Sequence, residues 1–315
     1  MCYNVFMEIP ITQSKEWHKL QDDLGEESVL ESTKSFHYLA IIKNTPMGNY
    51  LYCPYGPIAD NHTNFKKAII SLQELAKQYS AFFIRVEPFT ANFANFLPKS
   101  AKKSHDLNPK ETWLLDLTGN DQDFKSILPS RLLRYHRNAE KNGITIEKSH
   151  DENDIKHLLT LQKALAHEKG INTFSEKYLQ TELKQPFATL YLVKYKNPDT
   201  DQQEIVAAGL VFDDRTTRYN LQGAQSEQGR KLHATGILTI ELINDARAKK
   251  LKTFDFWGIA PEGASKNHPW AGFTAFKKTF NGHEFEHAGT YDIVLNKQKY
   301  CLYNLLRRAN KLRRH

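Results

Sequence analysis

Apolar residues along this chain recur at two different spacings, and the two spacings alternate from one end to the other. A spacing of three and four residues carries Phe65, Ala68, Ile69, Leu72 and Leu75, which predicts a helix with one buried face. The same spacing predicts helices over 13–25, 128–143, 155–166 and 237–246. Short apolar runs rich in aromatic and β-branched residues predict strands at 38–42, 50–53, 81–86, 113–117, 144–146, 189–195, 205–212, 218–222, 254–256 and 291–294.

This interleaving of helices and strands predicts an α/β or α+β fold with mixed sheets. Strands in the middle of the chain follow one another through short turns such as 197–201, as antiparallel pairs do. A length of 315 residues exceeds a typical single domain, and a second unit begins near Asp121. Two such units in series suggest a structural duplication, although no sequence repeat is visible.

One acid and one lysine stand out because of where the pattern puts them. Asp255 lies in an aromatic strand that ends at Gly258, and Lys277 lies one turn into a helix predicted to begin near Gly272. The end of a strand and the start of a helix is where chemistry commonly sits in mixed α/β folds. The segment therefore predicts a site.

Composition and charge narrow the class of protein only a little. There are 43 Lys and Arg against 36 Asp and Glu, an excess of +7 that suits a polyanionic ligand and equally suits a protein that simply has a high pI. Three distant cysteines without a CxxC pair indicate neither a zinc site nor a disulfide framework, which favours a reducing cytoplasm. Residues 1–10 lack the features of a signal peptide, and no apolar run approaches the length of a membrane span.

The segment His283–His287 is a literal HExxH, the zinc motif of metalloproteases. That motif binds zinc only on a helix, which brings both histidines to one face. Here Asn281-Gly282 is a hairpin signal and a strand follows, so we interpret the match as chance on an exposed strand. No metal is expected. No glycine-rich nucleotide loop of the GxxxxGK or GxGxxG type occurs.

The segment 228–236, which precedes a predicted helix, resembles the pyrophosphate loop of acetyl-CoA-dependent N-acetyltransferases. Counted from Arg230, the first glycine that this loop requires is replaced by His233. A side chain there would block the approach of phosphates to the backbone. The loop is therefore expected to keep the shape of that fold and to lack its cofactor.

Each of two basic segments has a purely structural interpretation and a ligand-binding one. Arg131, Arg134, Arg137 and Lys141 share a helix face, which is a solvated surface or a phosphate-binding one. The C-terminal segment 300–314 is apolar and then strongly basic. It is either a packed terminal helix with a charged tail or an arm that contacts anionic lipid or RNA.

Several motifs in order along the chain resemble those of the FemABX peptidoglycan bridge-forming aminoacyltransferases. The most specific are the closing set at 254–259, 268–273, 276–280 and 291–295, including Phe276-Lys277. Earlier matches are Gln13-Ser14 with Trp17 and Gly25, Tyr52-Cys53-Pro54-Tyr55-Gly56-Pro57 with Tyr55 in place of arginine, Phe83-Ile84-Arg85-Val86-Glu87-Pro88, and 134–143 with His136 in place of asparagine.

The resemblance implies two tandem acetyltransferase-like (GNAT-like) domains, with the last segment returning to the first. We place the first domain at 1–124 plus 290–315 and the second at 125–289. The family moves an amino acid from aminoacyl-tRNA to the stem-peptide amine of a peptidoglycan precursor and needs no added cofactor. The chain has no long helical hairpin and so looks like a compact member. The expected place is the cytoplasm, with peripheral membrane contact through the basic C-terminus as a further option.

The same resemblance implies roles for particular residues. Lys277, in the Phe276-Lys277 pair, would stabilise the oxyanion or the tRNA terminus, and its alternative is a surface cation beside Lys278. Glu87 would orient or deprotonate the incoming amine, and its alternative is an N-cap or an ion pair with Arg85.

The remaining candidates concern substrate binding. Asp255 would face the amine or be structural. Lys19 is the nearest cation to the family's precursor-phosphate lysine, although Gln21 stands where that lysine is expected. The Arg134, Arg137 and Lys141 face becomes a candidate tRNA surface. Two alternative functions stay open: an acyl-CoA-dependent N-acyltransferase, and a catalytically silent relative that binds RNA or precursor.

Overall fold

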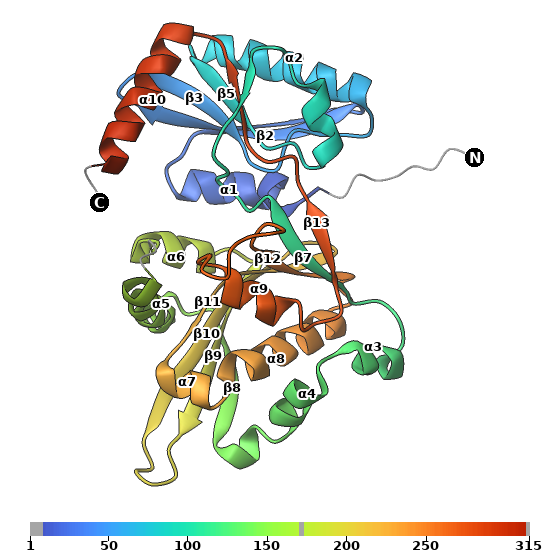
Figure 1. Cartoon of the computed structure of the whole chain (residues 1–315), viewed down its shortest axis with the longest axis vertical. Coiled ribbons are helices and arrows are strands. Elements are labelled where there is room, and N and C mark those ends of the chain that lie inside the picture. Colours follow the sequence, from blue (N-terminus) through green and yellow to red (C-terminus); the bar gives the residue numbers. More distant parts are fainter. Residues whose placement is uncertain (1–8, 170–172, 313–315) are drawn as a thin grey trace. The chain divides into compact units, whose positions relative to one another are not determined.

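The computed structural model describes residues 9–169 and 173–312, which divide into two compact units. The first contains residues up to 110 and from 286, and the second contains 111–285 (Figure 1). The predicted boundaries at 124/125 and 289/290 differ from this division. Residues 111–116 form a strand that pairs antiparallel with residues 253–258, so they belong to the second sheet. The return of the C-terminal segment to the first unit is observed.

The first unit is built on a mixed sheet whose strands run in the order β1-β2-β3-β5-β14-β6, with β4 beside β2. The strands are β1 (Ser28–Ser32), β2 (Phe36–Thr45), β3 (Gly48–Cys53), β4 (Ile58–Ala59), β5 (Phe83–Val86), β6 (Ala101–Lys103) and β14 (Tyr291–Val294). Its helices are α1 (Lys15–Asp23), α2 (His62–Gln78) and α10 (Lys297–Leu312), with short 3-10 turns at Ile11–Gln13 and Ala91–Phe96.

Helix α2 forms where the three-and-four-residue spacing of apolar positions predicts it. Asn61 caps it by accepting the Asn64 N–H, and its apolar stripe is buried against the sheet. The chain leaves the helix through Ser80, which has a φ of 50°, and then enters β5. Strand β5 is buried along its whole length and ends beside Glu87, so the fold delivers that acid to the end of a central strand.

The second unit is built on a sheet of order β13-β7-β12-β11-β10-β9-β8. The strands are β7 (Glu111–Asp116), β8 (Ile144–Ser149), β9 (Ala188–Lys196), β10 (Gln203–Asp213), β11 (Thr217–Gln225), β12 (Thr253–Gly258) and β13 (His283–Glu286). The helices are α3 (Asp121–Ile127), α4 (Ser130–Arg137), α5 (Ile155–Lys169), α6 (Glu176–Leu183), α7 (Glu227–Lys231), α8 (Ala234–Ala248) and α9 (Ala271–Lys277), with 3-10 turns at Glu140–Asn142 and Glu152–Asp154.

Strand β11 changes face part-way along its length. Its pairing with β10 shifts register between Leu210 and Phe212, so one extra residue is accommodated on β11. Arg218, before the shift, donates to the Leu242 carbonyl on α8. Gln222, beyond it, instead bonds to α5 and α6 through Gln162 and Glu182. The two faces of the sheet are therefore covered by different helices.

Beyond this shift, β11 and β12 separate. They pair in parallel only from Thr217 opposite Thr253 to Tyr219 opposite Asp255. The ladder stops at Asp255, so the backbone beyond it lies outside the parallel pairing.

Three local predictions are wrong in detail. The helix predicted over 128–143 is broken: α4 ends at Arg137, and a separate 3-10 turn leads to Gly143, whose φ is 74°. Lys277 is the last residue of α9, whereas the helix was expected to begin near Gly272 and to continue past a lysine one turn in. Asn281-Gly282 joins α9 to β13 and does not close a β-hairpin. Among the described helices none is both long and apolar enough to cross a membrane.

Candidate active site

Strand β12 is distorted where its parallel partner leaves it. Its pairing with β7 shifts register between Asp255 and Gly258. Within this irregularity Trp257 has a φ of 65°, a left-handed conformation that is uncommon for a large side chain. The Trp257 N–H donates to the Asp255 carboxylate at 2.7 Å. Strained backbone of this kind is concentrated at functional sites, so the end of β12 is a site candidate on geometry alone.

Asp255 is a buried acid with few partners. Only 6% of it is exposed, and this burial raises the pKa of its carboxyl to about 7, against the opposing effects of the Trp257 N–H and Lys277. Asp214, whose carboxylate accepts the Tyr219 hydroxyl at 2.7 Å, adds a smaller effect in the raising direction. Burial therefore favours the protonated form of Asp255 more than it does for an exposed carboxyl.

Lys277 meets this strand from the end of α9. Its ammonium donates to the Gly258 carbonyl at 2.6 Å. Burial lowers its pKa to about 8, and the charge of Asp255 partly opposes that shift. The neighbouring Phe276 anchors this end of α9. Its ring packs against the core and lies 5.4 Å from the Phe280 ring, centroid to centroid. The sequence-predicted acid and lysine are therefore brought together.

Asp255 and Lys277 thus lie near each other at β12, and burial brings their pKa values close together, to about 7 and about 8. A lysine whose pKa is near 8 is still largely cationic at neutral pH and can stabilise a developing oxyanion. An acid whose pKa is near 7 can hold or release a proton at the same pH. A second backbone contact fixes α9, since Thr274 Oγ1 accepts the Ala260 N–H at 2.8 Å.

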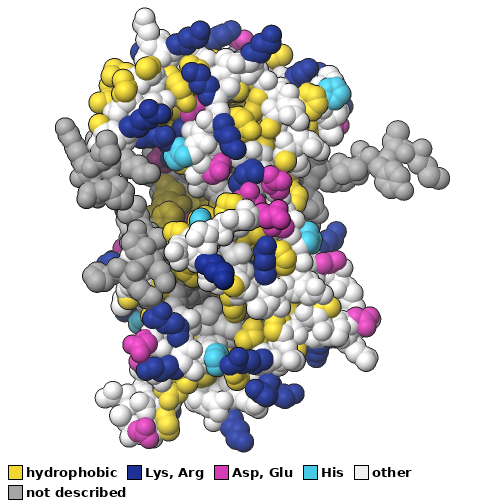
Figure 2. All heavy atoms as spheres, viewed as in Figure 1, with side chains coloured by type: hydrophobic (Ala, Val, Ile, Leu, Met, Phe, Trp, Pro, Cys, Tyr) yellow, Lys and Arg dark blue, Asp and Glu magenta, His cyan; other side chains and the backbone are white. Residues whose placement is uncertain are grey.

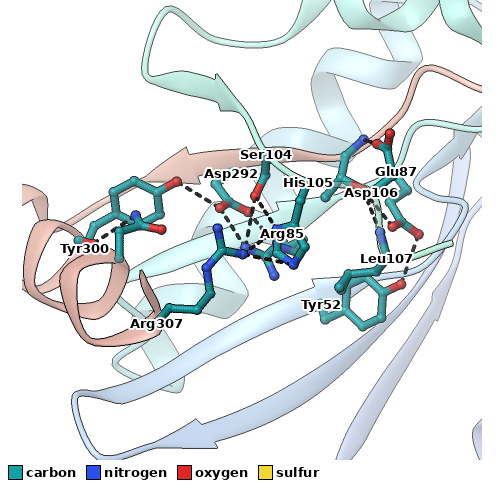
Figure 3. Close-up of polar contacts among 12 residues, drawn as sticks. Tyr52, Arg85, Glu87, Ser104, His105, Asp106, Leu107, Asp292, Tyr300 and Arg307 are labelled. Carbon is teal, nitrogen blue, oxygen red and sulfur yellow. Dashed lines mark hydrogen bonds and ion pairs between the residues drawn. The ribbon is translucent and has the colours of Figure 1, made fainter. Parts of the chain in front are cut away.

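Glu87, in the first unit, has a different environment (Figure 3). Its carboxylate accepts five hydrogen bonds, from the Tyr52 and Thr290 hydroxyls, the Tyr55 N–H, and both the N–H and the side-chain amide of Asn108. The expected alternative of an ion pair with Arg85 does not form. Arg85 instead binds Asp292 through two hydrogen bonds of 2.7 and 2.8 Å.

The other candidate residues lie on surfaces. Lys19 is exposed on α1, and the neighbouring Gln21 is buried. Arg134 and Arg137 are exposed on α4, and Lys141 is exposed on the turn that follows. Arg134 stacks over Tyr135 at 5.6 Å, as does Arg131 at 5.4 Å, so this surface combines guanidinium groups with an aromatic ring.

The loop before α8 has a histidine where an acetyl-CoA loop has glycine, as the sequence predicts. His233 adopts a φ of 57°, so it takes the backbone conformation that favours glycine. Its ring stacks on Tyr135 from α4, with 4.4 Å between centroids and 6° between planes. Aromatic side chains thus occupy the N-terminal end of α8, where a phosphate would otherwise approach the backbone.

The HExxH segment has no metal-site geometry. It lies on strand β13, where His283 is exposed, whereas His287 is buried and its Nδ1–H donates to the Phe89 carbonyl at 2.8 Å. Burial lowers the pKa of His287 to about 4. No group of three or more potential metal ligands occurs among the described residues.

Sequence reasoning missed two features of the second unit. The strained Trp257 carries no sequence signal beyond its place before a glycine. The buried chain of Gln162, Gln222 and Glu182 was also missed, in which Gln222 bonds to both neighbours at 2.9–3.0 Å. Isolated polar residues within a helical pattern look exposed until the partner strand is known.

The family model described as FemAB family matches residues 181–308, which include β12, α9 and most of α10. This match covers 128 of the 315 residues, less than half of the chain, and is a similarity to the FemAB family over that part. The structure of FemX is similar to this chain with a TM-score of 0.78 and 18% identity, covering 93% of this chain and 94% of that one. No curated protein matches the chain in sequence.

Two further structures share the fold of this chain. One is the C-terminal domain of a putative lysylphosphatidylglycerol synthetase from Agrobacterium fabrum, with a TM-score of 0.58, 14% identity and coverage of 94% and 92%. The other is a tandem GNAT protein from the clavulanic acid biosynthesis pathway, with a TM-score of 0.51, 12% identity and coverage of 85% and 83%. The predicted tandem GNAT-like fold is confirmed.

Proposed function

We propose that this protein transfers an amino acid from aminoacyl-tRNA to the stem-peptide amine of a peptidoglycan precursor. The observation that carries the proposal is the Lys277 ammonium held on the Gly258 carbonyl beside the buried Asp255, within the segment that matches the family. The fold that it shares with FemX supports the same assignment.

The reaction is aminolysis of an ester. The neutral amine of the acceptor attacks the ester carbonyl, a tetrahedral oxyanion forms, and the ribose oxygen leaves with a proton. Such a reaction depends on positioning and on positive charge near the oxyanion, and it needs no covalent enzyme intermediate. In this scheme Lys277 stabilises the oxyanion. The negative charge of Asp255 raises the pKa of Lys277 and so favours its charged form.

The exposed cations of α4 and its following turn, Arg134, Arg137 and Lys141, extend the proposal to the tRNA. Together with Tyr135 they present positive charge and an aromatic face, the features that contact a nucleic-acid backbone and its unpaired bases. In the first unit, Lys19 is proposed as a contact to the precursor phosphate. Glu87 is proposed as the group that orients the acceptor amine.

The main competing function is acyl transfer from coenzyme A, which a tandem GNAT fold also suits. The stacked Tyr135–His233 pair argues against it, because it fills the position where a pyrophosphate would contact the α8 N-terminus. Saturable binding of acetyl-CoA to the purified protein would favour this competitor.

The test is a transfer assay on the purified chain. It is incubated with a mixture of charged tRNAs and with either a nucleotide-linked or a lipid-linked precursor, and the muropeptide is weighed by mass spectrometry. The expected result is a mass increase of one amino-acid residue that is abolished when the tRNA is first treated with ribonuclease. No mass increase with any charged tRNA would contradict the proposal.

A further inference from the structure

The outer face of α10 is apolar. Its inner face holds the helix on the sheet, because the Tyr300 hydroxyl donates to Asp292 at 2.8 Å and Tyr303 packs on Phe83. On the opposite face Leu302, Leu305 and Leu306 are exposed by 47%, 58% and 44%. These three leucines, here called the leucine ridge, fall within five residues and share one side of the helix.

A cationic groove runs beside the leucine ridge. It is a hollow of about 410 Å³ between β6 and α10, and Leu305 lines it as well. Its cations are Lys102, Lys103, Lys297, Arg307 and Arg308. None of its described lining residues is an Asp or Glu. Figure 2 shows Lys and Arg side chains beside hydrophobic ones over the part of the first unit where α10 lies.

The positive charge of the groove is not balanced from within the first unit. The nearby Asp292 is already bound by Arg85 and Tyr300 (Figure 3). Arg307 contacts the ring of His105, at 2.9 Å from Nε2, so its guanidinium faces an imidazole and no carboxylate. Among the described residues none of the five groove cations forms an ion pair with an acid.

The kind of partner that fits this surface follows from its two parts, the cationic groove and the leucine ridge. An RNA backbone would use the cations and leave the leucines in water. A second copy of the chain would cover the leucines but bring two cationic grooves together. An anionic phospholipid surface uses both, because phosphate headgroups meet the cations while the leucines enter the acyl boundary. We propose that the leucine ridge and the cationic groove of α10 dock this protein on anionic phospholipid membranes.

Vesicle flotation tests this surface, and it does not depend on transfer activity. The full-length protein is mixed with vesicles of phosphatidylcholine alone or with 30% phosphatidylglycerol. We expect at least tenfold more protein to float with the anionic vesicles, and half a molar salt to reduce this share. Leu302→Asp with Leu305→Asp should lower the bound fraction at least tenfold. Lys297→Gln with Arg308→Gln should lower it several-fold.

Matched controls lie on α2 in the same unit. Ile70 is exposed by 58%, as much as Leu305, and Lys67 is an exposed cation three residues earlier. Ile70→Asp and Lys67→Gln should leave flotation unchanged. Circular dichroism of each variant shows whether it has folded.

The proposal would be overturned by equal flotation with neutral and anionic vesicles, by full retention of binding in the double leucine variant, or by a dimer in light scattering that this variant converts to a monomer. Tight binding of the groove to RNA that the leucine changes do not affect would likewise assign the surface to RNA. Since flotation requires no charged tRNA, its failure leaves the transfer proposal standing, and the reverse also holds.

Discussion

Glu87 and Asp255 are both buried acids, one in each unit, yet their surroundings differ: Glu87 directly follows β5, and Asp255 lies on β12 where its parallel pairing with β11 ends. Glu87 accepts five hydrogen bonds from hydroxyl and amide donors. Asp255 accepts one from the Trp257 N–H and has the Lys277 charge as its other stabilising neighbour. A buried carboxylate therefore has five hydrogen-bond donors in one unit and a single N–H donor in the other.

The difference indicates which acid can exchange a proton, and it leaves Glu87 the positioning role proposed for it. A carboxylate with a full set of hydrogen-bond donors holds its neighbours in place. A carboxylate buried with a single donor has a raised pKa and can exchange a proton near neutral pH. We therefore expect changes at the end of β12 to alter activity, and changes at Glu87 to alter the stability of the fold first.

The largest effect is expected for Lys277→Met. Loss of the ammonium removes the charge that stabilises the oxyanion, and such losses reduce turnover by roughly 10²–10³-fold. Single-turnover transfer from charged tRNA measures the effect. Lys278→Met is the matched control, because Lys278 is exposed and lies 3.6 Å from Glu284, so its loss should change the rate less than twofold. Equal rates for the two variants would remove Lys277 from the mechanism.

The second prediction separates the two acids by stability. Glu87→Gln turns one accepting oxygen into an amide that faces several donors, which should destabilise the fold by about 2–4 kcal/mol. Asp255→Asn keeps an acceptor for the Trp257 N–H and removes a buried charge, so it should not lower stability and should raise it at pH 7.5. Urea unfolding at pH 7.5 measures both. A larger loss for Asp255→Asn than for Glu87→Gln would reverse the comparison.

The pH dependence provides the third prediction. Transfer should decline above pH 8, by about tenfold per unit, because Lys277 loses its proton at a pKa of about 8. In Asp255→Asn this decline should begin at lower pH, since the acid no longer favours the charged lysine. In Lys277→Arg the decline should disappear, because a guanidinium stays charged. The measurement is the single-turnover rate between pH 6 and 9.5.

The sign of the stability effect follows from the same shifts. The folded pKa of Asp255 lies above its ordinary value near 4, so its contribution to stability is present at low pH and is lost as pH rises toward 7. The folded pKa of Lys277 lies below its ordinary value, so its contribution is full above about 10.5 and is lost as pH falls through 8. The free energy of unfolding of Lys277→Met, measured against pH beside the parent protein, should keep the Asp255 trend, a loss of stability as pH rises toward 7. It should lack the Lys277 trend, a loss as pH falls through 8.

The sequence was enough to predict the tandem fold and the meeting of Asp255 with Lys277, because both depend on local pattern and on motif order. It could not predict the strain at Trp257, which arises where two strands stop pairing. The partners of Glu87 were also hidden, since Asn108 and Thr290 are far apart in sequence and reach the acid only after folding. The place of β7 was hidden for the same reason: it belongs to the sheet with which it pairs, not to the segment before it in the chain.

Glu182 is a third buried acid, and it tests the comparison between Glu87 and Asp255. It accepts the Gln222 amide at 2.9 Å, and Tyr178 also bonds to it, so it has fewer donors than Glu87. Burial raises its pKa to about 8, against the effects of both partners. Its contribution to stability is therefore full below about pH 4.5 and is lost as pH rises through 8.

Glu182→Gln should remove this loss, because an amide accepts the same hydrogen bonds and does not ionise. Relative to the parent protein, the variant should gain roughly 1–2 kcal/mol of stability between pH 6 and pH 8. Glu176→Gln, exposed at the start of the same helix, should give no gain. Parallel unfolding curves for parent and Glu182→Gln at both pH values would mean that Glu182 is ionised in the folded protein. In that case the number of hydrogen-bond donors would not rank the three acids, and the contrast between Glu87 and Asp255 would have to rest on Lys277 alone.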